Sequence, residues 1–110
     1  DLVGPSYTKE IFFTGRKFTS NEALKMGLVN AVVNNDELEI YIDNLTNNIV
    51  ENAPLTIRSV KVSVNEGLKT HQNRNSEKVN KLVEECFNSE DYMEGRRAFM
   101  EKRRPKFKGK

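Results

Sequence analysis

Two apolar stripes with helical spacing occupy the middle of this 110-residue chain and constrain its fold more than any other feature. Their members recur every three or four residues: Leu38, Ile42, Leu45 and Ile49, followed by Ile57, Val60, Val64 and Leu68. Such spacing places side chains on one face of an α-helix. The segment Asn52-Ala-Pro54 separates the stripes, because proline is tolerated at a helix start but not in a helix interior. The sequence therefore predicts two consecutive amphipathic helices.

Helix signals also fill the chain before these stripes. Gly4-Pro5 predicts the start of a first helix, which ends at Gly15, because glycine readily adopts the left-handed conformation common at helix ends. Thr19 and Glu22 have the spacing of a capping box, in which each side chain bonds the other residue's backbone N–H. They predict a short second helix that Gly27 closes.

The chain after the stripes carries the same kind of signals. The polar stretch 70–75 predicts a loop, and Ser76 a helix start. Ser89 predicts the start of a last helix that runs as far as Pro105. Its first turn is acidic and its last turn is basic, which suits the helix dipole. These charged residues are Glu90 and Asp91, then Lys102, Arg103 and Arg104.

One segment favours extended structure. Leu28–Val33 is apolar and rich in β-branched side chains, which are enriched in strands. The sequence therefore predicts one short strand or extended segment here, in a chain that is otherwise mostly α-helical.

Composition excludes several classes of function. The net charge is only +2, so charge by itself gives no argument for nucleic-acid binding. No apolar run approaches the roughly 20 residues that a membrane-spanning helix needs. The single cysteine, Cys86, cannot form an internal disulfide, so we expect a reducing compartment and a cytoplasmic protein. The chain begins at Asp1 rather than Met, which indicates a fragment or a processed chain.

Candidate chemical groups have simpler structural explanations. A metal site needs three or four ligands, and His71 lies in a polar loop without a second His or a Cys nearby. Cys86 belongs to an apolar helical stripe, which favours a buried structural thiol over a nucleophile. The acidic residues fit helix-surface or capping positions: Glu22, Glu37, Glu77, Glu84, Glu90 and Glu101. We therefore expect no catalytic residue and no metal ligand in this chain.

The last part of the chain resembles the C-terminal end of the crotonase superfamily, the enoyl-CoA hydratases and isomerases. The matching residues run from Phe87 into the tail: Phe87, Ser89, Glu90, Asp91, Glu94, Gly95, Ala98, Phe99, Glu101, Lys102, Arg103 and Phe107. Two earlier blocks are similar to the same family and occur in the family's order. They are Ile11–Arg16 with Gly27–Asn30, and Asn52–Leu55 with Lys61.

The resemblance implies a fold and a division of the chain. We expect a mostly α chain: the C-terminal helical module of a crotonase-like (ClpP/crotonase spiral) fold, with at most one short strand. Residues 1–35 would end the spiral core, and residues 36–110 would form the C-terminal capping and oligomerisation module.

The resemblance also implies an activity for the whole protein, the hydration of 2-enoyl-CoA thioesters, with isomerisation or related acyl-CoA chemistry as close alternatives. In the family, two backbone N–H groups polarise the thioester carbonyl, and carboxylates handle water and the α-proton. Those parts would precede Asp1. This chain would supply the acyl-CoA cap and subunit contacts, with no covalently bound cofactor, in a homo-oligomer such as a trimer or hexamer.

The resemblance assigns coenzyme A binding to two residues, Phe99 and Lys102. In the family, such residues lie at the adenine end of coenzyme A, often across a subunit contact. A Phe ring can pack on a purine, and an ammonium group can meet a phosphate. We expect the two side chains on one face of one helix, because they are three residues apart. A further family contact is aromatic in some members and falls on Val83 here.

Two other classes of function stay open. The chain could be a stand-alone α-helical protein-interaction module without catalysis. A small nucleic-acid binder using the cationic tail is less favoured, because acidic residues are nearly as frequent and no platform of aromatic and basic residues is present.

Overall fold

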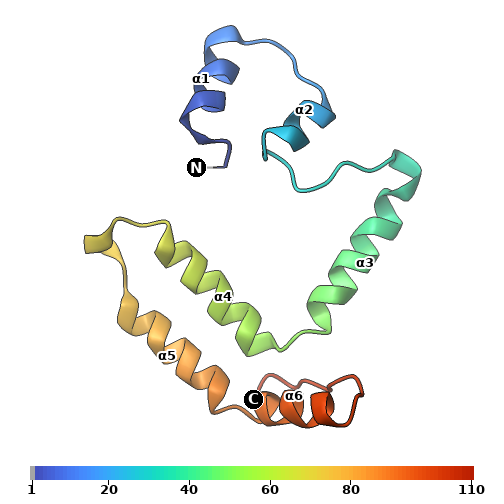
Figure 1. Ribbon diagram of the computed structural model, residues 1–110, viewed down its shortest axis with the longest axis vertical. Coiled ribbons are helices and arrows are strands. Elements are labelled where there is room, and N and C mark those ends of the chain that lie inside the picture. Colours follow the sequence, from blue (N-terminus) through green and yellow to red (C-terminus); the bar gives the residue numbers. More distant parts are fainter. Residues whose placement is uncertain (1) are drawn as a thin grey trace. The chain divides into compact units, whose positions relative to one another are not determined.

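The computed structural model describes residues 2–110, which form two compact units, one up to Tyr41 and one from Ile42 onward. Figure 1 shows a succession of α-helices joined by loops. No strand occurs in the part of the chain that the structure describes, so the mostly α fold class is confirmed. The assignment of residues 1–35 to a spiral core and of 36–110 to a capping module stays a prediction.

The first unit contains α1 (Gly4–Thr14), α2 (Ser20–Lys25) and the 3-10 helix η1 (Asn35–Glu37). The predicted helix ends at Gly15 and Gly27 are both confirmed, since each glycine has a positive φ. Gly15 has a φ of 56°, and its N–H donates to the carbonyl of Ile11. The predicted capping box is also present, with Thr19 accepting from the Glu22 N–H and Glu22 accepting from the Thr19 N–H.

Arg16 links α1 to α2 within this unit. Its guanidinium lies 2.9 Å from Glu10 Oε1 and 2.9 Å from Glu22 Oε1. The pKa of Glu22 lies below its usual value, chiefly because the carboxylate accepts the Thr19 backbone N–H and also pairs with Arg16. One arginine thus fixes the turn between two helices that bury little apolar surface of their own.

Of the two alternatives predicted for Leu28–Val33, a short strand or an extended segment, the strand is absent, and the segment consists of bends and irregular backbone. A strand needs hydrogen bonds to a second strand, and none of residues 2–110 provides one. The sequence pattern therefore indicated a partly apolar extended segment without showing whether it had a partner.

The two central helices lie where the stripes predicted them, as α3 (Leu38–Val50) and α4 (Pro54–Gly67). Their apolar stripes are not buried in this chain. Exposure ranges from 40% at Ile57 to 65% at Leu68 along α4, and is close to half along α3. The opposite side of α4 is the buried one, where Ser59 and Glu66 lie.

The α5 helix (Ser76–Phe87) runs back alongside α4 (Figure 1). The connection includes the 3-10 helix η2 (His71–Asn73) and depends on Glu66. This carboxylate accepts the Asn75 backbone N–H at 2.9 Å and pairs with Lys69 Nζ at 2.7 Å, which together lower its pKa. Asn75, rather than the predicted Ser76, caps α5 by accepting the Lys78 N–H.

The last helix, α6 (Glu90–Met100), starts at the predicted cap, since Ser89 accepts the Tyr92 N–H. It ends before the predicted Pro105. Lys102 adopts a φ of 52°, so that its N–H donates to Phe99 O and the Arg103 N–H donates to Ala98 O. This left-handed turn ends the helix. The tail then folds back along α6, so the basic residues 102–104 lie after the helix.

No helix in residues 2–110 is both long and apolar enough to cross a membrane.

Candidate functional site

The C-terminal tail is fixed to α6 by a buried carboxylate. Asp91 is only 3% exposed and accepts two consecutive backbone N–H groups, from Lys108 and Gly109, each at 2.7 Å. The Asp91 N–H in turn donates to the carbonyl of Lys110 at 3.1 Å. The sequence indicated only a favourable charge in the first turn of the helix, whereas the structure shows a specific attachment point for the tail.

A second carboxylate holds the start of the same tail. Glu94 pairs with both terminal nitrogens of Arg103, at 2.6 and 3.0 Å, and accepts the Lys106 N–H at 2.9 Å. The hydrogen bonds from Arg103, followed by the one from Lys106, lower the pKa of Glu94 to about 2. The same pairing raises the pKa of the Arg103 guanidinium. Residues 103–110 therefore follow a defined path along α6.

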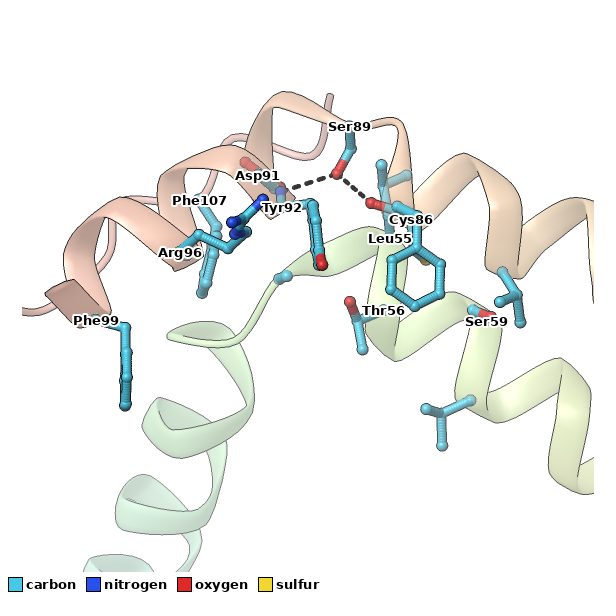
Figure 2. A pocket seen from close by; sticks show the side chains of 15 residues that line it. Leu55, Thr56, Ser59, Cys86, Ser89, Asp91, Tyr92, Arg96, Phe99 and Phe107 are labelled. Carbon is cyan, nitrogen blue, oxygen red and sulfur yellow. Dashed lines mark hydrogen bonds between the residues drawn. The ribbon is translucent and has the colours of Figure 1, made fainter.

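The fixed tail helps to form an apolar groove of about 580 Å³ between α4, α5 and α6 (Figure 2). Phe107 of the tail lies against Gly95, where an added Cβ would approach its ring to 3.5 Å. The groove-lining residues are mostly apolar: Ala53, Leu55, Thr56, Ser59, Val60, Val83, Cys86, Phe87, Ser89, Asp91, Tyr92, Gly95, Arg96, Phe99 and Phe107. We refer to this set as the apolar groove.

Aromatic rings and one guanidinium give the apolar groove its chemical character. The rings of Phe87 and Tyr92 meet edge to face, with centroids 5.1 Å apart. Arg96 lies over the Tyr92 ring, with its guanidinium carbon 6.0 Å from the centroid, within the range of a cation–π contact. Ser89 also lines the groove, and its hydroxyl donates to the carbonyl of Cys86 at 2.7 Å. The arrangement suits a flat apolar group that carries a negative charge.

Of the two predicted coenzyme A-binding residues, Phe99 lies on the apolar groove, and its side chain is 82% exposed. Figure 2 shows Tyr92, Arg96 and Phe99 projecting from the same side of α6. An exposed aromatic ring at the rim of an apolar groove can pack on a flat ligand without any rearrangement of the fold.

The other predicted residue, Lys102, is not on the same helix face as Phe99. The prediction assumed that α6 continues past residue 102, but the helix ends at Met100. Lys102 is exposed in the left-handed turn that follows, and its N–H bonds Phe99 O at 3.2 Å. The two residues are thus neighbours through the backbone. Their roles in coenzyme A binding stay predictions.

The remaining candidates lie as follows. His71 is exposed in η2, the connection between α4 and α5, and does not line the apolar groove. Cys86 is half-buried rather than fully buried and lines the groove. Val83 also lines it and is 38% exposed, so an aliphatic side chain occupies the position where some family members have an aromatic contact.

The acidic residues expected to have structural roles include several with clear contacts. Glu22 belongs to the capping box, Glu101 pairs with Arg103, and Glu90 pairs with Lys110 at 3.6 Å. These contacts are those of helix caps and surface ion pairs, which fix local structure and contribute little free energy individually.

The family model for enoyl-CoA hydratase/isomerase matches residues 1–110 of this chain. The chain belongs to the enoyl-CoA hydratase/isomerase family. Its resemblance to the crotonase superfamily is therefore confirmed, and its helices are part of a crotonase-like fold.

Several family members with different enzyme names are similar to this chain. The probable enoyl-CoA hydratase 2, mitochondrial, of Arabidopsis thaliana is 37% identical over 108 residues, which are 98% of this chain and 36% of that protein. The short-chain-enoyl-CoA hydratase of Clostridium acetobutylicum is 35% identical over 94% of this chain and 40% of its own length. The methylmalonyl-CoA decarboxylase of Escherichia coli is 36% identical over 97% of this chain and 42% of its own length.

Solved structures of family members agree with the fold. The enoyl-CoA hydratase from Bacillus anthracis superposes with a TM-score of 0.89 at 31% identity, covering 99% of this chain and 42% of that one. An enoyl-CoA hydratase/isomerase described as putative, from Mycobacterium abscessus, gives a TM-score of 0.86 at 30% identity, covering 99% and 45%. The chain thus spans well under half the length of the relatives that it matches.

Three residues of the site were not predicted from the sequence or from its resemblance to the family: Asp91, Glu94 and Arg96. The tail-fixing role of Asp91 and Glu94 was not predicted, because both carboxylates accept backbone N–H groups more than ten residues away. Arg96 was also missed. The sequence did contain one indication of its role, because Arg96 is three residues before Phe99 and that spacing puts both side chains on one helix face.

Proposed function

We propose that this chain is the C-terminal portion of an enoyl-CoA hydratase-like enzyme, which hydrates 2-enoyl-CoA thioesters in fatty-acid or related acyl-CoA metabolism. In this proposal the chain caps the acyl-CoA site and contributes contacts between subunits. The groups that polarise the thioester and transfer protons belong to the rest of the protein, and acyl-CoA is the substrate rather than a bound cofactor. Phe99 and Lys102 contact the nucleotide end of coenzyme A.

The observation that carries this proposal is the match of the enoyl-CoA hydratase/isomerase family model to residues 1–110. The backbone of Lys102 supports the proposed coenzyme A contact. Helices α1 and α2 are followed by a left-handed residue, and in both cases it is a glycine, Gly15 or Gly27. After α6 the same conformation is adopted by a lysine, at a steric cost of about 1 kcal/mol. Strained residues of this kind cluster at functional sites. Lys102 is joined to Phe99 by a backbone hydrogen bond, and an exposed cation and an exposed ring near the same helix end suit a ligand that joins a purine to phosphates.

The proposal predicts where activity resides. The whole enzyme should hydrate crotonyl-CoA, followed as loss of the conjugated thioester absorbance. The 110-residue chain, verified by mass, should give no turnover above the buffer blank, because in this proposal the paired N–H donors and the catalytic carboxylates belong to the rest of the protein. Inactivity of the whole enzyme toward 2-enoyl-CoA thioesters, or turnover by the isolated chain, would overturn it.

Assembly and location are further parts of the proposal. We propose a homo-oligomer, trimeric or hexameric, since the exposed apolar stripes of α3 and α4 offer surface for subunit contacts. The free thiol of Cys86 fits a reducing compartment, and we propose the cytoplasm. Sedimentation of the whole protein and fractionation of the source cells test these two points.

The exposed stripes also favour a second candidate, a helical interaction module without catalysis. The two candidates differ in ligand binding. The enzyme proposal requires coenzyme A to bind the whole protein, whereas an interaction module has no need of it.

A further inference from the structure

We propose that Arg96 is a phosphate-binding residue for the nucleotide end of the acyl-CoA substrate and acts together with Phe99 at the rim of the apolar groove. This inference rests on the proposed function, which it deepens by assigning a contact. Neither the family resemblance nor the relatives' names point to this position.

Helix geometry brings the two side chains together. Arg96 and Phe99 are three residues apart within α6 (Glu90–Met100), so they lie on one face, and both line the apolar groove. Figure 2 shows them on the same side of the helix, next to Tyr92. The arrangement that the sequence predicted for Phe99 and Lys102 is therefore supplied by Phe99 and Arg96.

The Arg96 guanidinium is available for a ligand. Among residues 2–110, no carboxylate lies within ion-pair distance of it, whereas Arg16, Arg103 and Arg104 are all paired with glutamates. The guanidinium carbon lies 6.0 Å from the centroid of the Tyr92 ring, a contact that orients the planar group and leaves its N–H donors free. An oriented guanidinium can bind a phosphate through two parallel hydrogen bonds.

The groove walls around Arg96 indicate which kind of phosphate ester would bind there. The groove offers aromatic and aliphatic walls from Phe99, Phe107 and Val83, and a purine can pack on such surfaces. Inorganic phosphate alone would leave these walls unused. The chemistry therefore fits a purine nucleotide whose base lies over the rim and whose phosphate, at the 3′ position or in the 5′ diphosphate, reaches Arg96.

Calorimetric titration of the whole protein tests this assignment, with coenzyme A, dephospho-coenzyme A and adenosine as probes. The variants are Arg96→Ala, Arg96→Lys and, as a matched control, Arg97→Ala. The control removes the same charge from the next position of α6, but Arg97 does not line the apolar groove. Arg96→Ala should raise the Kd of coenzyme A on the order of fivefold to tenfold, Arg96→Lys by less, and Arg97→Ala by less than twofold.

The three probes locate the contact. A contact with the 3′-phosphate predicts that Arg96→Ala weakens coenzyme A and spares dephospho-coenzyme A. A contact with the diphosphate predicts that both are weakened and adenosine is spared. Unchanged coenzyme A affinity in Arg96→Ala, or an equal loss for adenosine, would overturn the assignment while leaving the proposed function standing. Failure of the unmodified protein to bind coenzyme A would overturn both.

Discussion

Lys102 lies in the left-handed turn after α6, where its effect on fold stability can be measured separately from its proposed role in ligand binding. Glycine adopts the left-handed conformation of residue 102 with little strain, whereas any side chain with a Cβ is strained there. We predict that Lys102→Gly raises the free energy of unfolding by about 1 kcal/mol. Lys102→Ala retains the Cβ and should change stability little. Urea denaturation of both variants gives this comparison, and a less stable Lys102→Gly protein would contradict it.

Glu94 gives the tail attachment a defined pH range. Its pKa is lowered from 4.5 to about 2, so its ionised form stabilises the folded state fully above pH 4.5. That contribution is lost as the pH falls from 4.5 through about 2. The stability difference between the unmodified protein and Glu94→Gln should be constant from neutral pH down to about 5 and then shrink. A difference that disappears already near pH 6 would show that the pairing with Arg103 does not form.

At the scale of single helices, most boundaries were predictable because they depend on local chemistry. The Thr19 capping box, the Gly15 and Gly27 ends and the Ser89 cap involve neighbours within a few residues, which the sequence states directly. The end of α6 was predicted wrongly, since no glycine marks it. Of the two alternatives predicted for Leu28–Val33, a short strand or an extended segment, the strand was wrong, because a strand depends on a distant partner that local sequence cannot reveal.

In the candidate site, too, some features could be predicted from the sequence and others could not. Phe99 was found through a resemblance, and its place on the apolar groove agrees with a binding role. The groove itself could not be predicted, because Phe107 becomes one of its walls only after the tail folds back onto Asp91. Attachments that join a side chain to backbone N–H groups far along the chain leave no pattern in the sequence.

The position of the tail, residues 103–110, along α6 therefore depends on the hydrogen bonds that Asp91 accepts. Asp91→Asn should destabilise the protein by about 1–3 kcal/mol, because Lys108 and Gly109 donate to different oxygens of Asp91 and asparagine replaces one of these acceptors with an NH2 donor. Hydrogen exchange should accelerate at the amides of Lys108 and Gly109. Glu90→Gln is the control, since Glu90 forms only an exposed pair with Lys110. Unchanged exchange in Asp91→Asn would contradict this attachment.

For the whole molecule, exposed apolar surface predicts association of the isolated chain. Phe12 and Phe13 of α1 are 79% and 82% exposed, and the stripes of α3 and α4 are also open to solvent. Monomers rarely leave so many large apolar side chains exposed. Sedimentation of the 110-residue chain should show concentration-dependent self-association or an expanded species, together with binding of an apolar dye. A compact monomer with a sharp cooperative melting transition and no dye binding would contradict this.

The central proposal is that this part of the molecule binds coenzyme A and takes no part in the chemical step. Steady-state hydration of crotonyl-CoA by the whole enzyme and its Lys102→Ala variant tests it most directly. A contact made equally in the ground and transition states raises KM and leaves kcat unchanged. We predict a KM increase of about fivefold, as expected for a solvent-screened charge contact. A large fall in kcat at unchanged KM, or no change in either constant, would contradict the account.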